Sequence, residues 1–235
     1  MGGSVNYDTG LASDSPQRYM ISYVRKLFRS TNEHARYWRE RKIDWSQAYL
    51  STWNHPHRFM IRSVLKTFDW LSLLEVGCGA GANLMNLIQG GSMKQLGGID
   101  VSADAIKLCE ETFKGAFFKV GSVEDMLMSD SSCDVVLSDM TLIYIGPRKI
   151  DKVVEEMKRV ARLKLVLCEF HIPSLWERLW VKMTTGYNAY DYVTLLEKHG
   201  LHDVIRYKIP PEAWPGGGLQ EKYGYIIVAK VPRRK

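Results

Sequence analysis

Two glycines and an acid, set at fixed spacing, are the residues of this chain best suited to bind a nucleotide-like ligand. Gly77 and Gly79 follow the apolar run LLEV, and with Ala82 they fit the pattern G-x-G-x-x-G/A. Glycine has no Cβ, so the backbone there can approach a ligand closely. Asp100 lies 23 residues beyond Gly77, where an acid accepts hydrogen bonds from a ribose diol. These residues alone suit a dinucleotide or another ribose-bearing cofactor.

The elements that position these residues alternate between predicted strands and predicted helices. We expect buried strands in LSLLEVG, QLGGIDV, AFFKV, CDVVLSD and LKLVLCEF. Helices are expected between them in NLMNLIQ, SADAIKLCEETF and PRKIDKVVEEMKRVA, with Ser102 as the N-cap of the second. Strands that alternate with helices imply a parallel sheet covered by helices on both faces.

The C-terminal part of the chain departs from this alternation. After a helix in YDYVTLLEKHG, two predicted strands, LHDVIRYKIP and KYGYIIVAK, are separated by a loop that contains PEAWPGGG. Two strands with no helix between them must pair antiparallel. No internal repeat or second domain is visible, so residues 56–235 are expected to form one domain.

The residues before this domain are expected to form a helical cap over 16–55, after a disordered start over 1–15. Met20, Tyr23, Val24 and Leu27 recur at the spacing of one helix face. Eleven Lys or Arg and three acids fall between residues 17 and 66, a net +8 within a chain of net +6. A basic segment of this kind indicates an anionic partner such as nucleic acid, or simply a solvated helix face.

Composition and motif counts exclude several classes of protein. Hydrophobic residues make up 46% and charged residues 25%, as in ordinary soluble domains. No apolar run approaches the ~20 residues that span a bilayer, and the N-terminus does not read as a secretory signal. The four cysteines show no Cys-x-x-Cys pair, and HPH at 55–57 has no partner at ligand spacing. We therefore predict a cytoplasmic protein with reduced cysteines, no membrane contact and no metal site.

Four ordered motifs point to one family. They are LLEVGCGAGANL, GGIDVSADAI, VGSVEDM and SSCDVVLSDMTLIYI, and from about Leu71 to Phe170 the chain resembles class I S-adenosylmethionine-dependent methyltransferases. The depth of the glycine loop in the chain, the acid Glu75 before it and the closing antiparallel strands also separate it from dinucleotide-binding folds. The resemblance implies an α/β, three-layer, Rossmann-like fold. Its seven-stranded sheet would be mostly parallel, with one antiparallel C-terminal strand.

The resemblance also implies a donor site for S-adenosylmethionine, with S-adenosylhomocysteine as product. The residues implied around the methionine part are Glu75, Gly77, Cys78 and Gly79, with Asn83 over the donor's carboxylate. Those implied around the nucleoside are Asp100 for the ribose, Val101 against adenine, and Ser122 and Val123 at the adenine edge. Ser138 and Asp139 would face the methyl sulfonium. Family members often have Asp at the position of Ser122, and serine accepts a hydrogen bond there more weakly.

The acceptor side offers fewer signals. His171 follows the fifth strand and is a candidate general base, or else a hydrogen-bonded loop histidine. Tyr144 is a second candidate, or a packing aromatic. The aromatic residues of the cap, which form a lid over the cofactor or pack the cap on the sheet, are Tyr37, Trp38, Trp45, Tyr49 and Trp53. The motif Asn/Asp-Pro-Pro-Tyr/Phe is absent after the fourth strand, which disfavours the exocyclic-amine acceptors that it serves.

Three functions follow from this reading. The first is a methyltransferase that acts on an O or N of a small molecule by in-line displacement, without a metal or a covalent enzyme intermediate. Its acceptor would lie under the helical cap and the loops expected at 171–190 and 210–219. The second is a methyltransferase of RNA or protein that uses the basic segment, and the third is a donor-binding scaffold without catalysis. The sequence does not indicate the acceptor or the oligomeric state.

Overall fold

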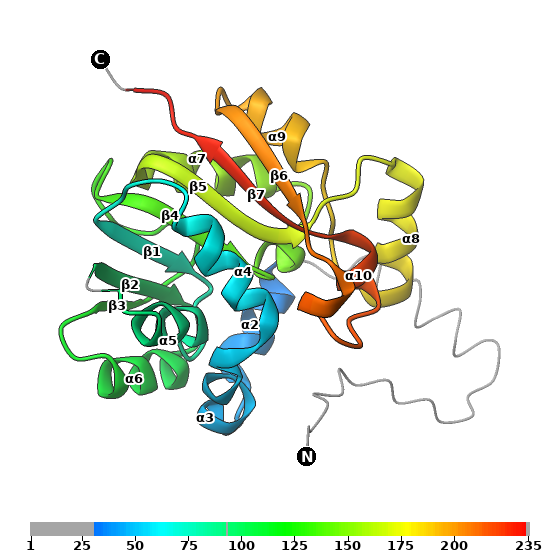
Figure 1. The fold of residues 1–235 in the computed structure, drawn as a ribbon. Coiled ribbons are helices and arrows are strands. Elements are labelled where there is room, and N and C mark those ends of the chain that lie inside the picture. The colour runs from blue at the N-terminus through cyan, green and yellow to red at the C-terminus, as the bar shows by residue number, and fades with distance from the viewer. Residues whose placement is uncertain (1–30, 93, 234–235) are drawn as a thin grey trace, which may run out of the picture.

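A seven-stranded sheet forms the centre of the protein (Figure 1). The computed structural model describes residues 31–92 and 94–233. Its strands are β1 (Ser72–Val76), β2 (Gln95–Asp100), β3 (Phe117–Val120), β4 (Cys133–Asp139), β5 (Ala161–Phe170), β6 (His202–Lys208) and β7 (Gly224–Lys230). Their order is β3-β2-β1-β4-β5-β7-β6. β1 to β5 pair in parallel, and β7 runs antiparallel to both β5 and β6. The predicted mostly parallel sheet with one antiparallel strand is confirmed.

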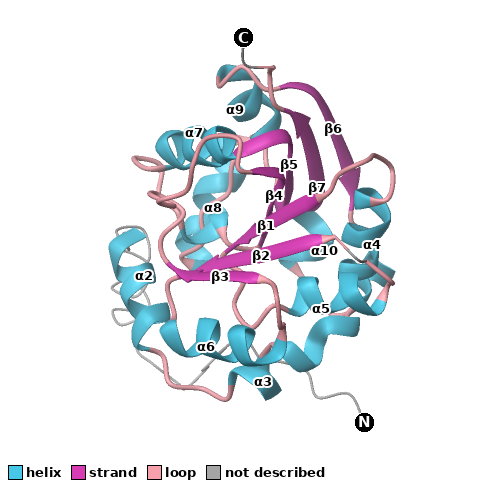
Figure 2. Ribbon diagram, turned by 90° about the vertical axis from the view of Figure 1, so that its left-hand side faces the viewer, coloured by secondary structure: helices cyan, strands magenta, loops and turns pink. Residues whose placement is uncertain are grey.

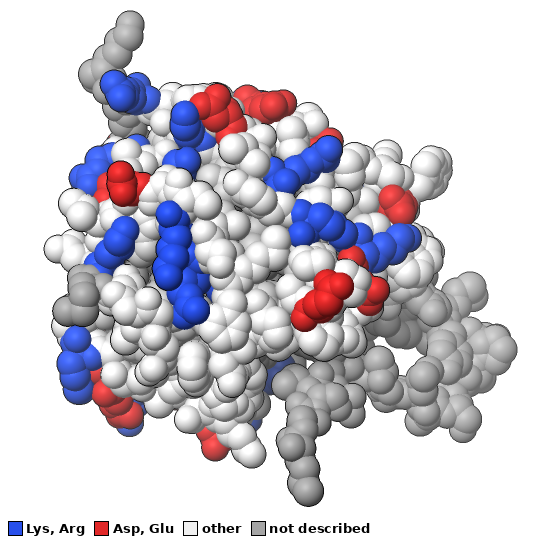
Figure 3. Space-filling model, in the orientation of Figure 1, with Lys and Arg blue, Asp and Glu red and all other residues white. Residues whose placement is uncertain are grey.

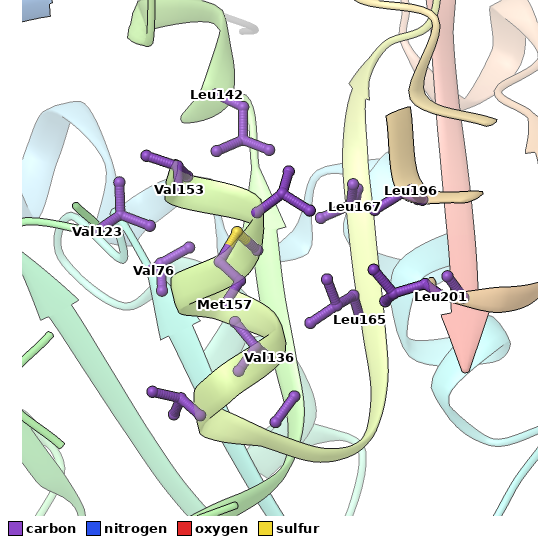
Figure 4. Packing of buried hydrophobic residues seen from close by; sticks show 14 of the residues in the cluster. Val76, Val123, Val136, Leu142, Val153, Met157, Leu165, Leu167, Leu196 and Leu201 are labelled. Atoms are coloured by element: carbon purple, nitrogen blue, oxygen red, sulfur yellow. The ribbon is translucent and has the colours of Figure 1, made fainter. Parts of the chain in front are cut away.

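Helices cover both faces of this sheet (Figure 2). On one face lie α4 (Pro56–Leu65), α5 (Ala82–Gln89) and α6 (Ala103–Thr112), and on the other lie α7 (Ile150–Val160) and α9 (Tyr192–Lys198). In α7, Val153 and Met157 belong to one buried cluster with Val136 of β4 and Leu165 of β5 (Figure 4). The protein therefore has the predicted three layers.

Burial on both faces explains why these strands read as apolar runs in the sequence. In β4, Val135 and Leu137 pack on the side of α4 to α6, while Val136 packs on the side of α7. This alternation follows from the two-residue period of a strand. Because each face is covered, apolar residues point to both faces in the middle of the strand, which makes such strands easy to find in sequence.

The N-terminal cap is broken into short helices. α2 (Thr31–Glu40), α3 (Trp45–Ala48) and the 3-10 turn η1 (Leu50–Asn54) precede α4. Residues 41–44 interrupt the predicted helical run, and Asp44 caps α3 by accepting the Gln47 N–H at 3.0 Å. The predicted stripe of Met20, Tyr23, Val24 and Leu27, and the expected disorder over 1–15, lie outside the described residues.

The regions expected as loops at 171–190 and 210–219 contain helices, which corrects that expectation. α8 (Leu175–Thr185) is capped by Ser174 and ends at Gly186, whose φ is 82°. The second region contains the short turn η3 (Pro211–Ala213) and leads into α10 (Leu219–Tyr223). Within the described part of the chain, no helix has the length and apolar character needed to cross a bilayer. A 3-10 turn, η2 (Leu142–Tyr144), follows β4.

Candidate active site

The glycine loop joins β1 to α5 through left-handed backbone. Gly77, Gly79 and Gly81 have φ values of 65°, 50° and 77°. Residues other than glycine rarely adopt this left-handed region. A Cβ on Gly77 would lie 2.2 Å from Thr141 Oγ1, whereas one on Gly79 would meet only a carbon of Trp45 at 3.8 Å. Gly77 is therefore needed for packing against the loop after β4, whereas a Cβ on Gly79 would make an ordinary van der Waals contact with Trp45.

Four acids end four neighbouring strands. They are Asp100 on β2, Glu75 on β1, Asp139 on β4 and Glu169 on β5. Parallel strands place their carboxyl ends at one edge of the sheet, where open α/β sheets bind ligands. The sequence interpretation missed Glu169. An acid within the otherwise apolar run LKLVLCEF is the signal that would have found it.

One oxygen of Asp139 accepts hydrogen bonds from three side chains. Its Oδ2 lies 3.0 Å from His57 Nε2, 2.9 Å from Arg58 Nη1 and 2.9 Å from Asn83 Nδ2. The charges and hydrogen bonds of these groups outweigh burial and hold the pKa of Asp139 well below its usual range. Its Oδ1 is buried and has no hydrogen-bond partner among the described residues. Asp139 therefore stays ionised, with one oxygen held and the other available.

His57 and Arg58, the two residues of α4 in this cluster, were not predicted as site residues. His57 is buried and stacks on Trp214, with ring centroids 4.0 Å apart. Its Nδ1 lies 2.5 Å from His55 Nδ1, and burial lowers the pKa of both histidines. The signal was the run HPHR, a concentration of polar groups at the start of a helix.

Glu75 is neutralised by its surroundings. It is buried, and its Oε1 accepts a hydrogen bond from Asn83 Nδ2 at 2.6 Å. Burial raises its pKa to about 8 against the opposing effect of that hydrogen bond. Its Oε2 finds no partner within residues 31–92 and 94–233. Asn83 thus bridges Glu75 and Asp139.

The nucleoside end of the predicted site is arranged around Asp100. Asp100 Oδ2 accepts the Gly79 N–H at 2.9 Å, and Oδ1 accepts the Ser102 N–H at 2.8 Å. Burial raises the pKa of Asp100, and these backbone hydrogen bonds oppose the shift. Beside it, Val101 is half-buried, and Val123 is buried. Ser122 is half-buried, and its Oγ accepts the Glu124 N–H at 3.2 Å.

Ser138 faces Glu169 inside the protein. Its hydroxyl donates to Glu169 Oε1 at 2.6 Å, and the same oxygen accepts the N–H groups of Thr141 and Leu142 at 3.0 and 2.9 Å. Burial raises the pKa of Glu169 to about 8. Glu169 therefore holds the turn that follows β4, and through it the position of Asp139.

The two predicted acceptor-side residues contact other parts of the protein. His171 is buried, with Nδ1 3.2 Å from the Tyr192 N–H and Nε2 3.1 Å from Arg206 Nη1. Burial lowers its pKa. Tyr144 packs among rings of the cap, with centroid distances of 5.2 Å to His34 and 5.5 Å to Trp38. The contacts of both residues favour packing, and their catalytic roles stay predictions.

The aromatic residues of the cap pack above the glycine loop. Trp45 is buried against Ala80 and Ala105, and its ring centroid lies 5.2 Å from that of Tyr49 and 6.1 Å from that of Trp38. The cap thus covers the loop that was predicted to bind the donor. All four cysteines are free and buried, and the described residues contain no cluster suited to a metal ion.

The residues at this edge fit S-adenosylmethionine. The amide group of Asn83 links Glu75 and Asp139. Each of these three residues also has a buried oxygen that accepts no hydrogen bond in the described structure. The donor is cationic and carries an ammonium group, so it would supply the missing hydrogen bonds and positive charge. Asp100, whose Oδ2 lies beside the Gly79 N–H, would take its ribose.

The fold and this edge together define a Rossmann-like methyltransferase. A family profile described as "Methyltransferase domain" matches residues 68–190, more than half of the chain. The chain belongs to this family, and it is an S-adenosylmethionine-dependent methyltransferase.

Solved structures share the fold at low sequence identity. A SAM-dependent methyltransferase from Aquifex aeolicus is 20% identical, with a TM-score of 0.55 over 81% of this chain and 100% of that chain. The plantazolicin methyltransferase BpumL, in complex with SAH, is 14% identical, with a TM-score of 0.58 over 92% and 98%. A SAM-dependent methyltransferase from Archaeoglobus fulgidus is 18% identical, with a TM-score of 0.52 over 74% of this chain and 94% of that chain. No curated protein matches the chain significantly.

Proposed function

We propose that the protein transfers the methyl group of S-adenosylmethionine to an oxygen or nitrogen of a small-molecule acceptor. The observation that carries this proposal is the enclosure of Asp139. Its side chain is only 6% exposed, under α4 and the loop that holds Trp214. An acceptor that reaches the end of β4 must fit beneath these elements, which favours a small molecule over a folded macromolecule.

The chemistry needs little from the chain beyond binding and orientation. S-adenosylmethionine supplies an activated methyl group when bound. Glu75, Asp100 and Asp139 would hold the cationic donor, and the cap would exclude water from it.

The contacts of the basic segment support this choice over RNA. Within it, Arg58 binds Asp139, Arg62 donates to Asn86 O at 2.9 Å, and Lys42 pairs with Asp104 at 2.7 Å. On the face seen in Figure 3, positive side chains form separate groups interspersed with negative ones. These arginines serve the fold, so a basic count alone does not indicate nucleic acid here.

An assay of S-adenosylhomocysteine release tests the proposal against its alternatives. The full-length protein is given S-adenosylmethionine with a metabolite extract, total RNA or a protein extract in separate reactions. We expect turnover with metabolites, and the mass of the product then names the acceptor atom. Turnover only with RNA or protein contradicts the proposal, as does tight donor binding without turnover on any pool, which would indicate a scaffold.

A further inference from the structure

Trp214 covers one of the histidines of the site. It lies in the loop between β6 and α10, and its ring stacks on that of His57 with centroids 4.0 Å apart and planes at 27°. It also meets the ring of His55, at 5.4 Å between centroids. Trp214 is only 8% exposed and His57 only 3% exposed. The indole and the imidazole therefore shield each other from water.

The backbone of this loop fixes the position of the indole. The Trp214 N–H donates to Pro211 O at 3.1 Å, and the Trp214 carbonyl accepts the Gly217 N–H at 3.0 Å. A Cβ on Gly217 would lie 2.5 Å from Trp214 Cδ1 and 2.8 Å from the Trp214 carbonyl oxygen. Glycine at position 217 is therefore required for the observed position of the ring, which gives the run PGGG a role beside the site.

The hydrogen bonds of His57 limit its protonation. Its Nε2 lies 3.0 Å from Oδ2 of the ionised Asp139, which can only accept, so Nε2 carries a hydrogen. Its Nδ1 lies 2.5 Å from His55 Nδ1, and only one hydrogen fits between these two nitrogens. At most one of the two rings can therefore be charged. Burial lowers the pKa of both histidines against the opposing effect of Asp139, so both rings are neutral at pH 7.

The neutrality of His57 decides the charge that a ligand meets. Arg58 lies 2.9 Å from the same oxygen of Asp139, so this pair has no net charge. Glu75, with a pKa of about 8, is also neutral at pH 7. A protonated His57 would add a full positive charge, which would repel the cationic S-adenosylmethionine. The titratable and charged groups that act on His57 within the described chain are His55, Arg58 and Asp139, and the stacked indole adds none.

We propose that Trp214 is a positioning residue for donor binding, which acts through His57. Its ring excludes water from the imidazole and keeps Nε2 directed at Asp139, so the site stays open to a cation. A tryptophan face by itself attracts cations, but burial is the largest influence on His57 and lowers its pKa. The inference rests on the proposed role of Asp139 in holding the donor.

Calorimetric titration of the full-length protein with S-adenosylmethionine at pH 6 and pH 8 tests this role. Trp214→Ala admits water to His57, whose pKa should then return toward about 6.5. Trp214→Phe keeps a ring over the imidazole and is the matched control. The ratio of donor affinities between the two variants should be about fourfold larger at pH 6 than at pH 8. The titration of Glu75 is common to both variants and cancels in this ratio.

Three further variants assign the effect to the stacked ring. Gly217→Ala displaces the indole without removing it and should give the same pH-dependent loss, which keeps the test open if Trp214→Ala does not fold. Gly216→Ala, at a φ of 69° and with no atom within 4 Å of its Cβ, strains the loop alone and should not. Trp70→Ala removes an equally buried indole before β1 and should lower stability without changing the pH dependence.

A double variant and Asp139→Asn complete the design. Trp214→Ala combined with His57→Gln should lose the pH-dependent difference, because no imidazole remains to be charged. A ratio that does not change with pH, an equal change in Trp70→Ala, or a change that persists without His57 overturns the inference. If Asp139→Asn binds S-adenosylmethionine as tightly as the unmodified protein does, the proposed donor site is wrong and the inference falls with it. Weaker binding by Asp139→Asn, with no pH effect of Trp214→Ala, refutes the inference alone.

Discussion

Asp139 carries most of the electrostatics of the site. Asp139→Asn keeps the shape of the side chain but removes the charge that His57, Arg58 and Asn83 surround. Loss of a charge-assisted hydrogen bond costs about 1.5–3 kcal/mol, so donor affinity should fall by about 10- to 150-fold. Calorimetric titration with S-adenosylmethionine measures it. Asp203→Asn, on the surface beside Lys230, is the control; equal affinities in both variants would contradict the assignment of Asp139.

We predict that Glu75 releases a proton when S-adenosylmethionine binds. With a pKa of about 8 it is neutral at pH 7, and a bound cation favours the ionised carboxylate. Donor affinity should therefore increase as pH rises toward 8 and level off above it. Calorimetry in buffers of different ionisation enthalpy counts the released proton. Glu75→Gln should abolish the pH dependence, and an unchanged slope in that variant would show that another group titrates.

Mutations of His57 and His171 should have different effects. His57→Ala removes a hydrogen bond to Asp139 and should weaken both the binding of S-adenosylmethionine and turnover. His171→Ala tests the predicted general base: a catalytic role requires turnover to fall while donor affinity is kept. The hydrogen bonds of His171 to Tyr192 and Arg206 instead predict a loss of thermal stability with little change in turnover per folded molecule. Melting curves and initial rates, measured together, distinguish the two.

At the scale of elements, the glycine loop can be tested by adding a single methyl group. Gly77→Ala places a Cβ 2.2 Å from Thr141 Oγ1 at a positive φ, so the loop after β4 must move. We expect a lower melting temperature and a large loss of donor affinity. Gly91→Ala, also at positive φ but with open space around it, carries the backbone strain alone. If both variants bind the donor equally well, the contact with Thr141 is unimportant.

The elements themselves were largely predictable, and the contacts between distant elements were not. The strands follow from apolar runs. The antiparallel pairing of β7 follows from the short connection between the last two strands, which contains the turn η3 and the five-residue helix α10 and is too short for a parallel crossover. The bond from Arg58 to Asp139 joins residues 81 positions apart, and no local pattern specifies it. α8 was missed because its apolar face points outward, so the stripe that normally indicates core packing had no place in the predicted fold.

For the molecule as a whole, buried acids set the pH dependence of stability. The pKa values of Glu75 and Glu169 rise to about 8, so above about pH 6.5, where the buried histidines are neutral in both states, the folded state binds more protons than the unfolded state up to about pH 8. The free energy of unfolding should therefore fall as pH rises through that range. The lowered pKa of Asp139 acts below about pH 4, where stability falls as pH falls.

Thermal melts of the protein without donor, at pH 4 to 9, measure this profile. Stability should peak on the acid side of neutrality. Glu169→Gln should flatten the decline above about pH 6.5, because a neutral amide replaces the neutral acid. Glu221→Gln, at an exposed position on α10, should leave the profile unchanged. A profile of Glu169→Gln that follows that of the unmodified protein would show that Glu169 does not titrate in this range.

The bonds from α4 to Asp139 have a consequence for the molecule's susceptibility to proteases. His57 and Arg58 tie the segment before the sheet to the same carboxylate that the donor would approach, so occupancy of the site and attachment of this segment are thermodynamically linked. Whatever strengthens the one strengthens the other by the same free energy. Cleavage between residues 41 and 55 should consequently slow when S-adenosylmethionine is added, which makes this segment a built-in reporter of ligand occupancy.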